Sequence, residues 1–317
     1  MRHPALGLWL ALLPGLLLGL LPGLLLGLLL GLLMPAATQA QGVTIGPIAP
    51  PQGAGNEQNH WIPVYVNGER RSTVLYLRSC QPPGAGKFPL AIVNHGSPPD
   101  ASRRSTTQPY SCTSALASWF LKRGFALAFP LRRGYGESGG DWAETYGACN
   151  SPNYVGGGLQ TANDIDAALR YMREQPQVDT GRILVVGQSA GGWGSIAFAS
   201  RAPEGVWGFA NFAGGRGGWA DNKPHNNCAP KALIEAAGRF GATARQPMLW
   251  VYTQNDTFFA PEISQAMYAA FSKAGGQADF HLLPAFGNDG HGLFTSRDGP
   301  PVWGPLLERF IASLPQR

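Results

Sequence analysis

Short apolar runs alternate with helical patterns along the chain from residue 60 onward. Runs typical of buried strands lie at 61–66, 73–77, 90–93, 125–129, 183–186, 209–212, 248–252 and 280–283. Patterns with one apolar face at helical spacing lie at 114–122, 161–173, 190–199, 261–273 and 302–314. Strands that are apolar on both faces and alternate with helices are typical of a parallel sheet covered on both sides. The pattern therefore predicts an α/β fold with a mostly parallel, twisted sheet and helices on both faces.

The first two strands form a different unit, because Asn67-Gly68 stands between them. This dipeptide is a strong signal for a tight hairpin turn, so we expect an N-terminal antiparallel hairpin at one edge of the sheet. Residues 41–59 are rich in Gly, Pro and Gln and lack periodicity, and we interpret them as an extended lead-in. No internal repeat or linker divides residues 60–317, which predicts a single domain there.

Residues 1–40 have a composition of their own. An uncharged, Leu-rich stretch of about 30 residues ends near Met34, and small residues precede Ala40. This order is typical of a signal peptide cleaved after Ala40, although the apolar stretch is longer than usual. A stretch of that length also fits a retained membrane anchor, but Pro14 and Pro22 weaken a helix there. We expect an exported protein, periplasmic or secreted, that meets a membrane only if residues 1–40 are retained.

Composition and cysteine usage narrow the possible classes of protein. Charged residues make up only 14% of the chain, and no dense run of Lys and Arg occurs beyond a few short basic pairs, so a nucleic-acid partner is disfavoured. Export implies an oxidising compartment in which disulfides form. None of the four cysteines belongs to a Cys-x-x-Cys motif, which disfavours a zinc site.

The ends of the predicted strands carry the candidate chemistry, because ligands of such sheets bind at the carboxyl ends of the strands. Gly187-Gln188-Ser189-Ala190-Gly191 stands between a buried strand and a helix. This Gly-x-Ser-x-Gly pattern makes a sharp turn that exposes the serine. A Cβ at position 187 or 191 would collide with the neighbouring strand or helix. Ser189 is therefore the candidate nucleophile, and a glycine-rich structural turn is the alternative.

The base and the acid are expected after the last two strands. His291 follows the final strand, and Asp256 follows the one before it. His225 and Asp289 are the weaker alternatives, the latter because it lies only two residues from His291. Together, Ser189, His291 and Asp256 would form a nucleophile, base and acid triad.

The loop after strand 90–93 reads Asn94-His95-Gly96-Ser97-Pro98. In a hydrolase of this geometry such a loop supplies one amide of the oxyanion hole. We assign the backbone N–H groups of Ser97 and Ala190 to that hole, since Pro98 has no N–H. His95 is interpreted as a structural histidine that ties the loop down.

These motifs resemble the α/β-hydrolase superfamily, in particular a dienelactone-hydrolase-like branch of exported proteins. The resemblance covers roughly residues 60–315 and rests on the order Ser189, Asp256, His291 and on the segments 94–97 and 130–139. It implies a serine hydrolase without metal or organic cofactor. Dienelactone hydrolases proper resemble this pattern but carry a cysteine nucleophile, so their lactone substrate does not carry over. We expect hydrolysis of small or polymeric carboxylic esters; a peptidase or amidase and a non-catalytic binding protein are the alternatives.

Two loops are expected at the active edge, residues 132–160 and 214–230. Their aromatic and histidine side chains either line a substrate pocket or pack the loops themselves; the candidates are Trp142, Tyr146, Trp219 and His225. The segment between strands 209–212 and 248–252 is too short for a full cap domain, so we expect a small lid. Arg132 and Arg133 follow a strand and either pair with a carboxylate such as Glu137 or bind a substrate carboxylate.

The same topology predicts how the cysteines pair. Cys149 and Cys228 belong to these two loops, which favours a disulfide across the mouth of the site. Cys80 follows an antiparallel strand and should lie at the opposite end of the sheet from Cys112. A Cys80–Cys112 disulfide is therefore not expected.

Overall fold

The computed structural model describes residues 43–66 and 68–315. The predicted signal peptide, residues 1–40, lies outside these residues. The described residues form a nine-stranded sheet with the order β1-β2-β3-β5-β4-β6-β7-β8-β9. The strands are β1 (Gly46–Pro47), β2 (Gln58–Val66), β3 (Glu69–Cys80), β4 (Phe88–Asn94), β5 (Ala126–Pro130), β6 (Val178–Gln188), β7 (Val206–Phe212), β8 (Met248–Thr253) and β9 (Ala278–Leu283).

The sheet is antiparallel at one edge and parallel elsewhere. Strands β1, β2 and β3 pair antiparallel, and β3 pairs antiparallel with β5. From β5 to β9 every neighbouring pair is parallel. Strands β5, β7 and β8 are buried along their whole length, which confirms the parallel sheet covered on both sides. The N-terminal antiparallel strands are confirmed as well.

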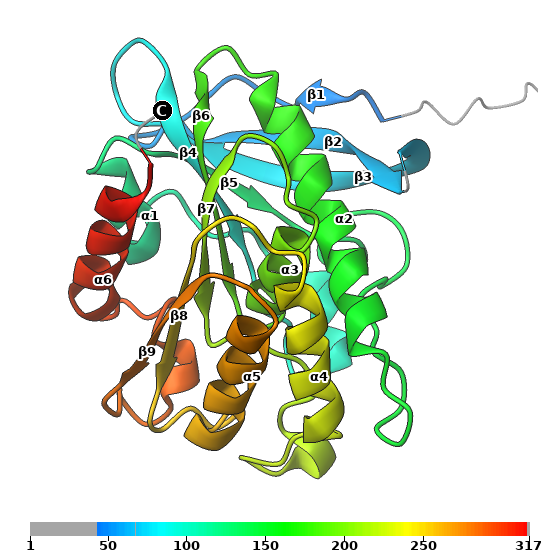
Figure 1. Cartoon of the computed structure of the whole chain (residues 1–317). Coiled ribbons are helices and arrows are strands. Elements are labelled where there is room, and N and C mark those ends of the chain that lie inside the picture. Colours follow the sequence, from blue (N-terminus) through cyan, green and yellow to red (C-terminus); the bar gives the residue numbers. More distant parts are fainter. Residues whose placement is uncertain (1–42, 67, 316–317) are drawn as a thin grey trace, which may run out of the picture. The chain divides into compact units, whose positions relative to one another are not determined.

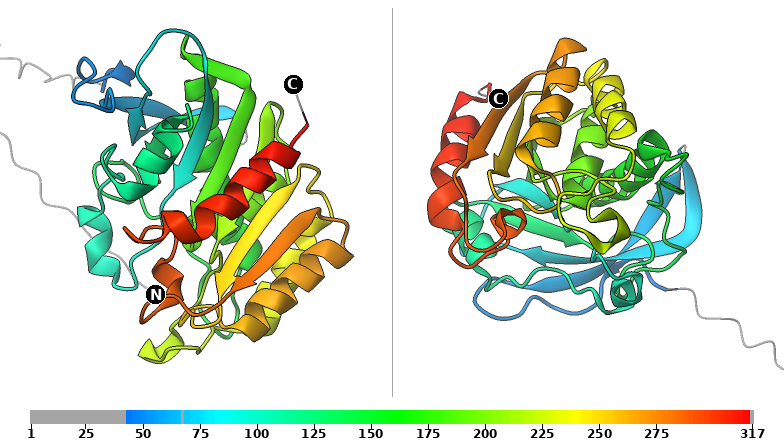
Figure 2. Two further views of the ribbon diagram at one scale, coloured as in Figure 1. Left: turned by 90° about the vertical axis from the view of Figure 1, so that its left-hand side faces the viewer. Right: turned by 90° about the horizontal axis from the view of Figure 1, so that it is seen from below.

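Helices cover both faces of the sheet (Figure 1). They are α1 (Ala115–Leu121), α2 (Tyr154–Arg173), α3 (Ala190–Ala199), α4 (Pro230–Gly241), α5 (Pro261–Lys273) and α6 (Pro300–Ser313), with short 3-10 turns η1 (Ala101–Thr106), η2 (Ala220–Asn222) and η3 (Gly290–Gly292). Helices α2 to α5 lie on one face, whereas α1 and α6 lie on the other, where α6 crosses in front of the strands (Figure 2, left). None of the helices among residues 43–66 and 68–315 is both long and apolar enough to cross a membrane.

The sheet separates two apolar cores, because successive side chains of a strand point to opposite faces. Val185 of β6 packs with Trp193 of α3 on the first face. Its neighbour Val186 packs with Phe120 of α1 and Trp303 of α6 on the second face. This double burial fixes the register of β6 and so fixes where its carboxyl end lies.

Two helices differ from the sequence expectation. Helix α2 begins at Tyr154, seven residues before the predicted start, and the Asn153 side chain caps it by accepting from the Gly156 amide (2.8 Å). Its glycines are packing positions: a Cβ on Gly158 would press on Ala197 and Phe240. Helix α4 lies in a segment that the sequence analysis leaves without a helix. It packs beside α2 and α5 on one face of the sheet.

Two disulfides connect the four cysteines, as is typical of proteins from oxidising compartments. One joins Cys149 to Cys228, the pairing that the loop placement favours. The other joins Cys80 to Cys112, so the expectation against this pairing is wrong.

The path of the chain before α1 explains this error. The segment from His95 to Ser114 runs beside β5 and β3 before the short helix α1 begins. Tyr110 packs edge-on against Phe129 of β5, at 5.6 Å between ring centroids, and Arg78 of β3 donates to the Pro109 carbonyl (3.4 Å). Cys112 has therefore already reached the end of the sheet where β3 ends.

Candidate active site

Ser189 occupies a sharp turn between β6 and α3. Its backbone has φ 54° and ψ −119°, a conformation uncommon for a residue with a Cβ and often found at functional sites. A Cβ on Gly187 would collide with the Gly191 carbonyl group, and a Cβ on Gly191 with the carbonyl group of Asn94. The turn therefore requires glycine on both sides of the serine.

His291 and Asp256 meet beside this turn. The His291 ring nitrogen Nδ1 lies 3.0 and 3.1 Å from the two carboxylate oxygens of Asp256. The Asp256 carboxylate is fully buried and also accepts from the backbone amides of Phe258 (2.8 Å) and Phe259 (2.9 Å). Because a carboxylate only accepts hydrogen bonds, it favours the tautomer with the proton on Nδ1 and leaves Nε2 free to accept a proton.

The structure brings Ser189 and His291 to the same edge of the sheet. The side chain of Gln188 donates to the His291 carbonyl (3.1 Å), which ties the end of β6 to η3. Within residues 43–66 and 68–315, no hydrogen bond joins the Ser189 hydroxyl to the His291 ring. Such bonds are often long without substrate and tighten when it binds.

Asp289, the alternative acid, faces the backbone rather than the imidazole. Its carboxylate accepts from the His291 amide (3.0 Å) and from the amide and hydroxyl of Thr257 (3.1 and 2.6 Å). These contacts shape the loop that carries His291. The ring itself is held by Asp256 and stacks on Phe258, at 4.1 Å between centroids.

Ser97 and Ala190 lie with Ser189 in the lining of a cavity of about 150 Å³. For the part of the chain that the structure describes, no acceptor pairs with the backbone N–H of either residue. His95 anchors the loop that carries Ser97. Its Nδ1 contacts the Gly96 carbonyl (2.6 Å), and its Nε2 accepts from the Arg132 amide (3.3 Å). Burial, with a further contribution from Arg132, lowers the pKa of His95 to about 3, so the ring stays neutral.

Two of the four pocket candidates line this cavity. Trp142 and Tyr146 do, together with Phe258 and Phe259, which sequence reasoning missed although they lie two and three residues after Asp256. Trp219 and His225 are not part of the lining: Trp219 stacks behind Phe258 at 5.4 Å between centroids, and His225 is exposed.

Arg132 and Arg133 each pair with a carboxylate, which confirms the first of the two interpretations, but the partners are Glu144 and Asp164 rather than Glu137. The Arg132 guanidinium is buried against Glu144, with Nε 2.8 Å and Nη2 3.1 Å from its oxygens. Arg133 binds Asp164 through its Nε (2.6 Å) and its backbone amide (2.9 Å). Asp164 is only 2% exposed, so this second pair is buried as well.

The cavity has a cationic wall that the sequence analysis also missed. Arg216, which follows β7, is 5% exposed and lies 2.8 Å from the same oxygen of Glu144 that Arg132 contacts. Its Nε has no hydrogen-bond partner among the described residues. On the other side, the guanidinium of Arg104 lies 3.5 Å over the ring of Trp142. Unused donors beside the candidate nucleophile Ser189 can bind acceptor oxygens of a ligand.

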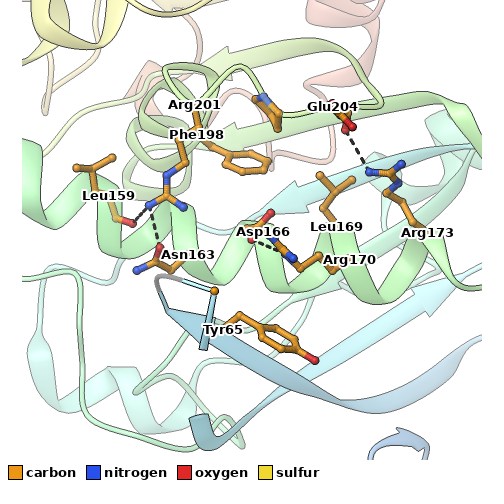
Figure 3. A pocket seen from close by; sticks show the side chains of 12 residues that line it. Tyr65, Leu159, Asn163, Asp166, Leu169, Arg170, Arg173, Phe198, Arg201 and Glu204 are labelled. Atoms are coloured by element: carbon orange, nitrogen blue, oxygen red, sulfur yellow. Dashed lines mark hydrogen bonds and ion pairs between the residues drawn. The ribbon is translucent and has the colours of Figure 1, made fainter. Parts of the chain in front are cut away.

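A larger cavity, of about 660 Å³, lies away from Ser189 along α2 (Figure 3). Its arginines all have partners within the chain: Arg170 pairs with Asp166 (2.7 Å), Arg173 donates to the Glu204 carbonyl (3.4 Å), and Arg201 donates to Asn163 (2.8 Å). With its charges paired in this way, this cavity is a weaker candidate than the one beside Ser189. Three or more potential metal ligands do not cluster anywhere in the described ranges.

Comparison with known proteins agrees with this architecture. The sequence model of the dienelactone hydrolase family matches residues 115–302. None of the curated proteins matches the chain.

Three solved structures illustrate the likeness. The chain is similar to the acylaminoacyl peptidase of Pyrococcus horikoshii (14% identity, TM-score 0.58), over 81% of this chain but only 41% of the peptidase. It is similar to an acetyl xylan esterase from Paenibacillus sp. R4 (15% identity, TM-score 0.57), over 86% of this chain and 88% of the esterase. It is also similar to a protein assigned as a dienelactone hydrolase from Klebsiella pneumoniae (14% identity, TM-score 0.53), over 81% of this chain and 99% of that protein. At these identities the likeness shows a shared fold, which confirms the predicted α/β-hydrolase architecture.

Proposed function

The chain belongs to the dienelactone hydrolase family, and we propose that it is an exported serine hydrolase that cleaves carboxylic esters through Ser189, His291 and Asp256. The contact between His291 and the buried Asp256 carboxylate at 3.0 Å, beside the strained Ser189 turn, is the observation that carries the proposal. Serine takes the position at which dienelactone hydrolases proper carry cysteine, so the lactone substrate is not part of the proposal.

The proposed reaction follows the geometry. The Ser189 hydroxyl attacks the acyl carbon while His291 Nε2 accepts its proton and then returns it to the leaving alcohol. Water, activated by the same nitrogen, releases the acid from the acyl-enzyme. The amides of Ser97 and Ala190 donate to the oxyanion, and one such donor is worth about 2.7–4 kcal/mol.

The cavity limits which ester fits. A volume of about 150 Å³ between Trp142 and Phe258 holds a short acyl group. Arg216 and Arg104 make the cavity cationic, so a long alkyl chain would have to displace water from two guanidinium groups. We therefore propose short acyl groups on a small or polymeric alcohol, with that alcohol facing solvent.

Export is part of the proposal. Two disulfides and the predicted signal peptide both point to an oxidising compartment outside the cytoplasm. Release from the membrane rests on cleavage after Ala40. N-terminal sequencing of the exported protein tests that step directly.

The test compares p-nitrophenyl acetate, butyrate and octanoate with a peptide anilide, using protein exported with its disulfides oxidised and a Ser189→Ala variant. We expect acetate to be cleaved fastest and all turnover to vanish in Ser189→Ala. A preference for the anilide would instead support a peptidase, a class represented by the acylaminoacyl peptidase neighbour. No Ser189-dependent turnover, together with no labelling of Ser189 by a fluorophosphonate, would leave a binding protein.

A further inference from the structure

Glu144 is a buried carboxylate between the loops that form the proposed site. Its oxygen Oε2 accepts from Arg132 Nε and from Thr161 Oγ1, both at 2.8 Å, and forms an ion pair with Arg216 Nη2 at the same distance. Its oxygen Oε1 accepts from Arg132 Nη2, from the Tyr135 hydroxyl and from Trp142 Nε1 (3.3 Å). One carboxylate thus connects the loop after β5, helix α2 and the loop after β7.

Two of these donors hold the oxyanion loop. The Arg132 guanidinium also donates to the His95 carbonyl through Nη1 (2.7 Å), and its backbone amide donates to the His95 ring. The hydroxyl of Tyr135 lies 2.8 Å from the Ser97 hydroxyl. Since the single proton of Tyr135 is drawn to the Glu144 carboxylate, the tyrosine oxygen is left to accept from Ser97. The position of the Ser97 amide therefore depends on Glu144 through two side chains.

The other donors form the wall of the cavity. Arg216 and Trp142 both line it, and both contact Glu144. Burial by itself would raise the pKa of Glu144, but the guanidinium groups of Arg132 and Arg216 hold it well below its usual range. The carboxylate is therefore charged at every pH at which the protein would work, and it balances one of the two buried cations.

We propose that Glu144 is a positioning residue that sets the oxyanion loop and the cationic wall of the cavity in one fixed arrangement. The inference rests on the proposed function. Glu144 touches no reacting atom; it acts through Tyr135 and Arg132 on the loop and through Arg216 on the wall. A buried ion pair by itself is weak evidence for stability, whereas five hydrogen-bond donors and a second guanidinium, gathered on one carboxylate from two site loops and helix α2, indicate a geometric role.

A neighbouring ion pair supplies the matched control. Asp164 is also a buried carboxylate, and it pairs with Arg133, the residue directly after Arg132. Neither Asp164 nor Arg133 lines the cavity. Asp164 holds the same loop through Arg133 but contacts neither Glu144 nor the cavity, so Asp164→Asn removes a comparable buried charge from that loop while leaving the Glu144 cluster in place.

The experiment compares Glu144→Gln, Tyr135→Phe and Asp164→Asn in the full exported chain with p-nitrophenyl acetate. In Glu144→Gln one oxygen becomes an NH2 group that faces existing donors, and two guanidinium groups lose their shared counter-charge. We expect kcat to fall by about 10²-fold, the effect of losing one oxyanion donor, with KM changed less than about threefold because the lost interaction acts on the transition state. Tyr135→Phe keeps the ring, and its kcat should fall about tenfold, which is a partial loss of that donor.

A second readout separates positioning from folding. A phenylboronic acid forms a tetrahedral adduct with the nucleophilic serine and uses the oxyanion hole, so its inhibition constant should weaken by the same factor as kcat/KM in both site variants. Asp164→Asn should lower the thermal midpoint while leaving kcat and boronate affinity within about twofold of the native values, because a change in stability alone does not alter the transition-state contacts of the folded enzyme.

The outcomes are distinguishable. If Glu144→Gln is folded but loses no more kcat than Asp164→Asn, the inference is wrong. If Glu144→Gln does not fold, Tyr135→Phe decides: an unchanged boronate affinity overturns the inference. Failure of the native chain to show Ser189-dependent turnover would instead refute the proposed function.

Discussion

Replacement of Asp256 by asparagine separates orientation of the histidine from support of the loop. The carboxylate oxygen Oδ1 accepts from the amides of Phe258 and Phe259 and from His291 Nδ1 (3.0 Å). Among the residues that the structure describes, Oδ2 has a hydrogen bond with His291 alone (3.1 Å). An asparagine that keeps its oxygen toward the two amides must place its NH2 group where Oδ2 stands. The NH2 group then faces Nδ1–H at about the distance of Oδ2 (3.1 Å), and Nδ1–H keeps as acceptor only the oxygen that already serves two amides. The imidazole relieves this donor–donor contact by moving its proton from Nδ1 to Nε2.

That change of tautomer removes the base, because a protonated Nε2 cannot accept the proton of Ser189. We expect kcat of Asp256→Asn to fall by about 10⁴-fold, which corresponds to about 5.4 kcal/mol of transition-state stabilisation. The free energy of unfolding should fall by less than about 1.5 kcal/mol, since the loop amides keep their acceptor. Asp256→Ala should lose both the activity and the loop bonds, with about 1–3 kcal/mol for each buried amide left unpaired.

The assay is hydrolysis of p-nitrophenyl acetate at pH 8, with urea unfolding of each variant beside it. Asp289→Asn is the matched control, because that carboxylate also binds loop amides but does not contact the imidazole. It should lose less than about tenfold in kcat, a small loss beside the 10⁴-fold effect of a wrong tautomer. The reasoning fails if Asp256→Asn keeps more than a tenth of the native kcat, or if Asp289→Asn loses as much as Asp256→Asn.

Three further predictions concern stability. Gly191→Ala should cost about 3 kcal/mol or more in urea unfolding, because its Cβ meets backbone that cannot move aside, whereas a Cβ on Gly292 meets nothing within 4 Å and Gly292→Ala should cost little. Cys149→Ser with Cys228→Ser opens a closure of 79 residues, which should lower the free energy of unfolding by about 4 kcal/mol in urea titration. Burial lowers the pKa of His60 to about 4, so the unfolded chain takes up its proton first. The stability that the neutral His60 contributes is complete above pH 6.5 and is lost as the pH falls from 6.5 to 4. The loss in the free energy of unfolding amounts to up to about 3 kcal/mol. A plot of thermal midpoint against pH should therefore be flatter over this range for His60→Gln than for the native chain.

The features of the fold that the sequence predicts are those coded locally. Each strand that is apolar on both faces became a strand of the sheet, and the Gly-x-Ser-x-Gly turn stands between β6 and α3. The steric demand at Gly187 is local too, since the colliding atoms belong to Gly191 in the same turn. The demand at Gly191 comes from Asn94 at the end of β4, and the motif itself indicates it. Helix α4 also has a local signal, although the sequence analysis does not predict it. Its buried side chains lie at helical spacing: Leu233, Ala236, Ala237 and Phe240.

What the sequence could not predict depends on the path of long loops. The Cys80–Cys112 disulfide exists because the segment before α1 runs beside the sheet, and no residue within it specifies that route. The partners of Arg132 and Arg133 are 12 and 31 residues away in sequence. Sequence reasoning places charges at the surface by default, and it therefore assigned these arginines to a nearby carboxylate or to a substrate.

The buried charges and the Cys149–Cys228 disulfide act on the same two loops. The disulfide joins the loop before α2 to the loop after β7, and Glu144 of the first loop binds Arg216 of the second. A cavity walled by loops keeps a fixed shape only if the loops are held against each other, because surface loops are the more mobile parts of a fold. One covalent and one ionic connection between the same segments supply that constraint close to Ser189. If this cavity is the substrate site that we propose, its volume of about 150 Å³ sets a limit on substrate size before any chemical contact is made.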